Sequence, residues 1–505
     1  MKKILSLLLA CAIMVTVLCV PAFAKTKINY TIENPYEDVD WEKWSGYKTQ
    51  LHAHTTASDG FQTIHEAIAD YYALNYDIVA ITDHGTTNKG WNVAPDTVPV
   101  MREIKKERTG GADNPVIPLT DEEYSAYTGG TANSVSFSYK DGETLVDTGI
   151  SRTHKNGMLD VPKGNELNMA TPICDCHLTC YWSDYGQGLA GVYGDYETPS
   201  AEVNKDGGIT MLSHVGEYVY PDKDSADHVG QPVDEYFVNK FARIFLDNVG
   251  SSVGMGINSA TDAHTRCDRI LYDQILQKTI PNGVTPWGFT FSDSHSETSI
   301  NDAYDILYMP ELTEEALRDC MLKGQFFAVS HYSNGYELNG MQEMEGYHDN
   351  CEDVEWWKDN TPVVTKMEVD EDNGVIKVWG ENFNYITWVS DGNVVLRDYD
   401  CSDGYAELDL NSTELYDDIH LFVRFYLTGE NGICYSQPMV VQREGETFDS
   451  VEVPETYDVP AFLRELVTLL DDAFFKFNPI VWIFKYFALG YNPITQAFPS
   501  LEQYF

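Results

Sequence analysis

The stretch "QLHAHTTASDG", residues 50–60, places two histidines one residue apart and follows them with a Ser-Asp-Gly turn. If a strand leads into this stretch, His52 and His54 project from one face, because side chains at positions i and i+2 of a strand point the same way. This spacing suits two ligands of one metal ion. A lone His-x-His is more often a polar pair on a solvated strand, so other parts of the sequence are needed to distinguish a metal site from such a pair.

Three further apolar runs end in residues of the same kind. "YDIVAITDHG" ends at Asp83 and His84, "GGITMLSHVGEY" contains His214, and "PWGFTFSDSHS" contains Asp293 and His295. A stretch with helical periodicity, "IHEAIADYYALNY", separates the first run from the second. In a β/α barrel the carboxyl ends of successive parallel strands form the active face. Four runs that end this way predict one metal site there rather than four unrelated solvated loops.

The composition limits the partners. The chain has 505 residues, with 33 basic against 79 acidic side chains and a formal net charge of −46. Such a charge repels nucleic acid backbones and anionic membrane surfaces, which attract proteins through lysine and arginine. We therefore expect no nucleic acid binding. A small-molecule phosphate ester would need local positive charge, which bound metal ions can supply.

Taken in order, these stretches resemble the four motifs of the PHP family, named for polymerase and histidinol phosphatase. "LHAHTTASDG", "ITDHG", "LSHVG" and "SDSH" match motifs one to four, and the resemblance covers roughly residues 47–332. The resemblance implies a distorted (β/α)7-type barrel. It also implies a cleft that binds two or three divalent metal ions, which would be zinc, manganese or iron.

The resemblance further implies three groups of ligands. They are His52, His54 and Asp293 with a bridging glutamate; His177 and His214 with the same glutamate; and Asp59, His84 and His295. We expect the glutamate, Asp293 and His214 to act directly in catalysis. Asp59 stands where some family members have histidine, which gives the third group a harder character.

The bridging glutamate has two candidates. Glu166, in "DVPKGNELNM", follows a glycine and precedes His177 by eleven residues, as in the Gly-x-Glu element of relatives. Glu123 is explained by a capping box with Thr120 at the start of a helix. We therefore choose Glu166.

Three other polar residues are candidates for supporting roles. Asp83 is placed to orient a ligand histidine from behind. Arg266 and Arg269 are candidates for holding a phosphate, with solvated helix residues as the equally simple alternative.

The expected ligands favour a metal-dependent phosphoesterase that uses metal-activated hydroxide. The first alternative is hydrolysis of a carboxylic ester, amide or carbamate at the same site. The second is a non-catalytic surface-binding protein with structural metals, which a ligand set that leaves room for water disfavours.

The N-terminus has the form of an export signal. Lys2 and Lys3 precede an apolar stretch, and "AFA" at 22–24 gives a cleavage site, so we expect a secreted or extracellular protein. Lipid attachment at Cys11 is the weaker alternative.

For "CDCHLTC", which ends at Cys180, we favour free thiols or a local disulfide over a zinc knuckle.

The rest of the chain adds smaller units. Short β-rich runs separated by Gly, Asn and Asp turns predict a β-sandwich. A helical tail follows, which could contact a membrane interface or a partner but more simply docks on the protein itself. No later segment has about 20 uninterrupted apolar residues, so we expect no spanning helix.

A segment rich in Gly, Ser and Thr, about 109–157, is either a lid or a surface insertion. The predicted divisions are 1–24 (signal), 25–46 (N-terminal segment), 47–335 (PHP domain), 360–445 (β-sandwich) and 458–505 (helical tail).

Overall fold

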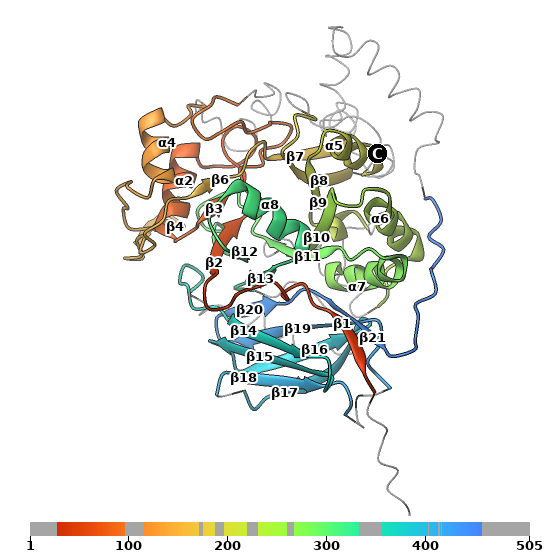
Figure 1. Ribbon diagram of the computed structural model, residues 1–505. Coiled ribbons are helices and arrows are strands. Elements are labelled where there is room, and N and C mark those ends of the chain that lie inside the picture. Colours follow the sequence, from red (N-terminus) through yellow and green to blue (C-terminus); the bar gives the residue numbers. More distant parts are fainter. Residues whose placement is uncertain are drawn as a thin grey trace, which may run out of the picture.

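A computed structural model shows a mixed α/β protein in which strands outnumber helices (Figure 1). The structure describes residues 28–95, 116–170, 175–186, 196–219, 231–259, 267–332, 355–401, 403–412, 415 and 417–456. The expected signal, the helices of the expected tail and Arg266 lie outside these residues. No helix among the described residues is long and apolar enough to cross a membrane.

The larger of the two main sheets has eleven strands, which come from both the early and the late parts of the described chain. Its order is β1 (Tyr30–Glu33), β21 (Met439–Arg443), β19 (Phe422–Gly429), β20 (Gly432–Tyr435), β13 (Phe326–Ser330), β12 (Ala303–Met309), β2 (Ser45–Gln50), β3 (Ile78–Val79) and β6 (Leu159–Asp160), with β16 (Tyr385–Ser390) and β17 (Asn393–Asp398) attached through β19. The antiparallel pair β13–β20 joins the part of the chain that carries the four motifs to the β-rich part that follows, with Ala328 opposite Tyr435. The region expected as a β-sandwich therefore shares a sheet with the strand that leads into His52.

The second main sheet carries most of the remaining strand ends. Its order is β11 (Trp287–Phe291), β10 (Ser252–Ser259), β9 (Ile209–Leu212), β8 (Asp175–Tyr181) and β7 (Asn165–Ala170). Strands β9, β10 and β11 are mutually parallel, whereas β8 runs antiparallel to both of its neighbours. His177 thus reaches the site from within an antiparallel strand.

Along the chain, the helices alternate with strands. They are α2 (Ile64–Ala73), α4 (Asp121–Thr128), α5 (Glu197–Lys205), α6 (Glu235–Asp247), α7 (Asp268–Thr279) and α8 (Glu314–Lys323), with the 3₁₀ turns η1 (Val215–Tyr218) and η4 (Ile280–Asn282). The periodicity of residues 64–76 is confirmed as α2, which opens with a capping box between Thr63 and Glu66. The predicted capping box of Thr120 and Glu123 also forms, at the start of α4.

The two main sheets meet at the ends of their strands and just beyond them. Ala53 forms a parallel bridge with Ser294, and His84 forms one with Glu166. The backbone N–H of Glu166 also donates to the carbonyl of Thr82 at 3.1 Å. The described strands do not form one closed hydrogen-bonded sheet, so the expected barrel stays a prediction, but these bridges hold the motif residues in register.

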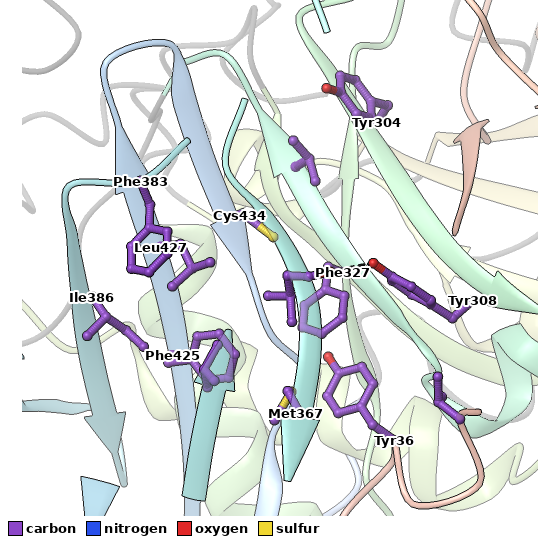
Figure 2. Close-up of a cluster of buried hydrophobic side chains, with 14 of the residues drawn as sticks. Tyr36, Tyr304, Tyr308, Phe327, Met367, Phe383, Ile386, Phe425, Leu427 and Cys434 are labelled. Carbon is purple, nitrogen blue, oxygen red and sulfur yellow. Dashed lines mark hydrogen bonds between the residues drawn. The ribbon is translucent and has the colours of Figure 1, made fainter. Parts of the chain in front are cut away.

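A three-stranded sheet packs against the far end of the larger sheet (Figure 1). Its strands are β14 (Val363–Asp370), β15 (Val375–Glu381) and β18 (Tyr405–Asp409), and a separate hairpin comprises β4 (Ser138–Asp141) and β5 (Thr144–Asp147). Figure 2 shows Phe425 and Leu427 of β19, Met367 of β14 and Phe327 of β13 in one apolar cluster. This core continues without a break from the three-stranded sheet to the strands next to β2.

The N-terminal segment ties the two parts together. Strand β1 pairs with β21, and the Tyr36 ring stacks on Phe327 with 4.5 Å between centroids. The Tyr36 hydroxyl donates to the carbonyl of Phe326 at 3.0 Å and accepts from the N–H of Gln437 at 2.8 Å. One side chain therefore bridges β13 and the segment between β20 and β21.

Five cysteines of the described residues are buried free thiols: Cys180, Cys267, Cys320, Cys401 and Cys434. Cys180 is thus a thiol rather than half of a local disulfide. Burial raises the pKa of its thiol above the ordinary value. A deprotonated Cys180 ligand is accordingly disfavoured in this structure.

A buried ion pair gives the first prediction. Arg424 of β19 donates to Asp273 of α7 through two nitrogens, at 2.8 and 2.7 Å, and both side chains are about 1% exposed. Removing one partner leaves the other buried without its counter-charge, so Arg424→Leu should lower the free energy of unfolding by about 3–5 kcal/mol. Urea denaturation measures this loss. The double variant Arg424→Leu with Asp273→Leu should recover most of it, and equal losses in both variants would contradict the prediction.

Candidate metal centre

All nine residues expected as ligands converge on one place in the structure. They come from strand ends or the loops that follow them: His52, His54 and Asp59 after β2, His84 after β3, Glu166 on β7, His177 on β8, His214 after β9, and Asp293 and His295 after β11. Their ligand atoms form three groups, each within 4.8 Å: His52, His54, Glu166 and Asp293; Glu166, His177 and His214; and His54, Asp59, His84 and His295. The placement matches the expected grouping, except that His54 also lies beside the third group.

Glu166 lies at the centre of the site, with no solvent-exposed surface. Its Oε2 atom lies 3.0 Å from Nε2 of both His52 and His54. Its Oε1 atom lies 3.1 Å from Nδ1 of His177 and 3.2 Å from Nε2 of His214. One carboxylate therefore presents each of its two oxygens to a different group of histidines, which is the geometry of a bridging ligand.

The first group has the dimensions of a metal coordination shell. Nε2 of His52 lies 3.2 Å from Nε2 of His54, and Asp293 Oδ1 lies 3.2 and 3.0 Å from these two nitrogens. Ligand atoms about 2.0–2.1 Å from a tetrahedral ion are separated by about 3.3 Å. Imidazole and carboxylate donors suit zinc, manganese or iron. The residues present therefore fit a divalent cation.

The third group lies on the open side of the site. Asp59 Oδ1 lies 3.3 Å from Nε2 of His295, and Asp59 Oδ2 lies 3.5 Å from Nε2 of His84. The His295 side chain is 34% exposed, against 0% for those of His52 and His54. His295 Nδ1 lies 2.8 Å from the carbonyl of Asp293. Because a carbonyl only accepts, Nδ1 carries the proton and Nε2 is left to face Asp59.

Tight backbone geometry places several of these ligands. His214 and Asp293 have positive φ angles of 25° and 47°, which non-glycine residues rarely adopt. A Cβ on Gly60 of the Ser-Asp-Gly turn would lie 2.5 Å from the backbone carbonyl of His54. A Cβ on Gly164, two residues before Glu166, would lie 2.4 Å from the carbonyl oxygen of Ile81. Both glycines are therefore required for close approach.

The charges of the site favour ionised carboxylates. Burial alone would raise the pKa of Glu166, but the nearby His52, His177 and His84 hold that pKa well below its usual range. The pKa of Asp293 is lowered in the same way, since His52 and His295 outweigh its burial. Both side chains are thus anionic acceptors under ordinary conditions.

Two expected supporting residues behave differently from the prediction. Asp83 forms no direct contact with a ligand histidine: its carboxylate accepts from Thr55 and Ser58 instead. Arg269, in α7, is neither solvated nor a surface phosphate ligand, because it is 1% exposed and donates to Asn258 and the Tyr435 hydroxyl. Asp83 instead orders the loop after β2, and Arg269 connects α7 to β10 and β20.

Sequence reasoning missed two neighbours of the ligands. Glu217 Oε2 lies 3.2 Å from Nδ1 of His214, on the ring edge opposite Glu166. The Ser58 hydroxyl lies 3.2 Å from Nδ1 of His54. The spacing His-x-x-Glu in "SHVGEY" could have indicated the first contact, since a carboxylate behind a ligand histidine is a common arrangement.

Comparisons with known proteins give distant structural similarity. No family model and no curated protein matches the chain. A two-domain protein from Bacteroides vulgatus, containing a predicted PHP-like metal-dependent phosphoesterase, is 11% identical over 82% of this chain and 99% of that chain, with a TM-score of 0.34. A lesion-specific endonuclease from Pyrococcus furiosus is 9% identical (55% and 56% covered, TM-score 0.27), and an amidohydrolase from Chromobacterium violaceum is 12% identical (49% and 87% covered, TM-score 0.25). At these TM-scores the functional conclusion rests on the site itself.

The geometry of the two candidate glutamates gives the second prediction. Glu166→Gln should remove most of the bound metal, because both main groups share its carboxylate. Glu123→Gln should leave metal content unchanged and cost only about 0.5–2 kcal/mol of stability through the lost helix cap. Elemental analysis of the purified variants measures the metal per chain. Loss of metal in the Glu123 variant alone would show that the wrong glutamate is assigned.

The paired histidines give the third prediction. His52→Ala combined with His54→Ala should lower the metal content, because it removes half of the ligands of the first group. His65→Ala is a matched control from the same segment, since His65 contacts Pro118 and Glu123 on the surface and belongs to none of the groups. Circular dichroism checks that the variants fold. Full metal occupancy in a folded double variant would rule out this ligand assignment.

Proposed function

We propose that this chain is a metal-dependent hydrolase of the PHP type that cleaves a small-molecule phosphate ester. The observation that carries the proposal is the buried Glu166 carboxylate, whose two oxygens face separate groups of histidines. The four motifs that bring these residues together occur in the family's order. A barrel of the family's type and action after export are part of the same proposal.

Divalent ions bound in these groups would lower the pKa of a water and neutralise charge on phosphoryl oxygens. The chain supplies the ligands that would hold them, with Glu166, Asp293 and His214 nearest the shared space between the first two groups. His214 Nε2 lies 3.2 Å from Glu166 and 3.8 Å from Asp293 Oδ2. These three residues are therefore the ones that would hold and orient the reacting groups.

Charge balance favours a phosphate over a neutral carbonyl substrate. The nine residues include three carboxylates, and their histidines are neutral when they act as metal ligands. Two divalent ions would only balance these three carboxylates and one metal-activated hydroxide, whereas three ions would carry two positive charges more than these groups. The site would then be locally cationic within a chain of net charge −46, and an anionic substrate would gain from it.

A substrate comparison gives the fourth prediction. The ratio of kcat/KM for phosphate esters to that for carboxylic esters should exceed unity, and a chelator should abolish both activities. Restoring Mn²⁺ or Zn²⁺ should restore cleavage of phosphate esters. Steady-state kinetics on the two substrate panels, with matched leaving groups, measures the ratio.

The alternatives correspond to distinct results of this experiment. A metal-loaded protein that cleaves carboxylic esters or carbamates and leaves the phosphate panel intact would replace the proposal with carbonyl hydrolysis. A metal-loaded protein that cleaves neither panel would favour a binding protein with structural metals. Glu123→Gln serves as the control, because it should retain wild-type kinetics.

A further inference from the structure

A buried hydrogen-bond network lies directly behind the first pair of histidines. Asp83 is 3% exposed, and its Oδ1 atom accepts from the Thr55 N–H and from the Ser58 hydroxyl, each at 2.7 Å. Its Oδ2 atom accepts from the Thr55 hydroxyl, also at 2.7 Å. Both carboxylate oxygens of Asp83 therefore serve as acceptors in this network.

The direction of the Ser58 bond determines what its oxygen can do next. A serine hydroxyl has one proton, and the closest acceptor is Asp83 at 2.7 Å, against 3.3 Å for Asp59 Oδ1. With its proton on Asp83, Ser58 Oγ can only accept from the ring nitrogen at 3.2 Å, which is Nδ1 of His54. The carboxylate of Asp59, 3.4 Å from the same nitrogen, is also an acceptor. Both neighbours of His54 Nδ1 therefore require a proton on that nitrogen.

We propose that Asp83 and Ser58 are positioning residues that keep the proton of His54 on Nδ1, so that Nε2 is its metal-binding atom. Nε2 is the atom that lies 3.0 Å from both Glu166 Oε2 and Asp293 Oδ1. This proposal rests on the proposed function only in taking the first group as metal-binding. Its consequence is that His54 serves the first group, although its ring also lies beside the third.

The same assignment explains the position of Asp83 in the sequence. Asp83 precedes His84, yet it reaches back to the loop after β2 rather than to a histidine ring. The loop between His54 and Asp59 is thereby tied to the end of β3. A single carboxylate orders the ring of one ligand and the turn that carries another.

The fifth prediction concerns the protonated nitrogen of His54. Nuclear magnetic resonance of the full chain, labelled with ¹⁵N-histidine and loaded with Zn²⁺ alone, distinguishes a protonated ring nitrogen from a zinc-bound one. The expected result for His54, assigned by its loss in His54→Ala, is a protonated Nδ1 and a zinc-bound Nε2. Zinc on Nδ1 would overturn the proposal, and this measurement needs no change to Ser58.

Variants give a second test of the hydrogen-bonded chain from Asp83 through Ser58 to His54, which is called the relay below. Ser58→Ala removes the link between Asp83 and His54, and its zinc affinity should fall roughly 10- to 100-fold, as for other partners behind ligand histidines. Thr55→Val is the matched control, because it also removes a hydroxyl bond to Asp83 but leaves the link from Asp83 through Ser58 to His54 in place, so its zinc affinity should fall much less than that of Ser58→Ala. Competition with a chelating dye measures both affinities.

The outcomes separate the relay from a purely structural role and from the proposed reaction. Equal losses in Ser58→Ala and Thr55→Val would show that the network merely stabilises the loop, and would overturn the proposal. Unchanged affinity in Ser58→Ala would overturn it too. Neither readout uses an ester substrate. The relay can therefore be confirmed in a protein that does not cleave phosphate esters, and it can be refuted in a protein that does.

Discussion

The burial of one carboxylate among histidines is the constraint on which this site depends. Glu166 has no exposed surface, yet five histidines lie within about a hydrogen-bond length of its two oxygens. A buried charge is costly unless it is matched, so the strands that carry these histidines must be held in one arrangement. The bridges His84–Glu166 and Ala53–Ser294 supply that arrangement through the backbone. The two glycines that permit close approach of the chain belong to the same constraint.

The second half of the chain supports the site from a distance. Strand β2 leads into His52 and pairs with β12, which pairs with β13, and β13 pairs in turn with β20. The Arg424–Asp273 pair adds a tie between β19 and the helix before β11. Because sheet pairing and a shared core connect these elements, the β-rich region packs continuously with the part of the chain that carries the candidate metal centre. The strand that leads into His52 is thereby connected through β12 and β13 to β20.

The sequence predicted the parts of the site that are encoded locally. A His-x-His at a strand end, an Asp-x-His and a Gly-x-Glu each show their chemistry within a few residues, and the structure brings those residues together. Contacts between distant segments were not readable in this way. The pairing of β13 with β20 joins residues about a hundred positions apart, and the partners of Asp83 and Arg269 depend on loop and helix packing that periodicity does not encode. Asp83 was expected behind a ligand histidine, and the structure connects it to His54 through the Ser58 hydroxyl and not by a direct contact.

The net charge of the chain bears on how cations reach the candidate metal centre. A net charge of −46 repels free anions, but it raises the local concentration of divalent cations around the protein. This long-range attraction is screened over about 8–10 Å at physiological salt, so it assists encounter rather than holding an ion in place. Binding depends instead on the three carboxylates and the histidines that surround them at short range. Under the proposed function, the acidic character of the chain therefore helps to load the centre, and the loaded centre presents positive charge to an anionic substrate.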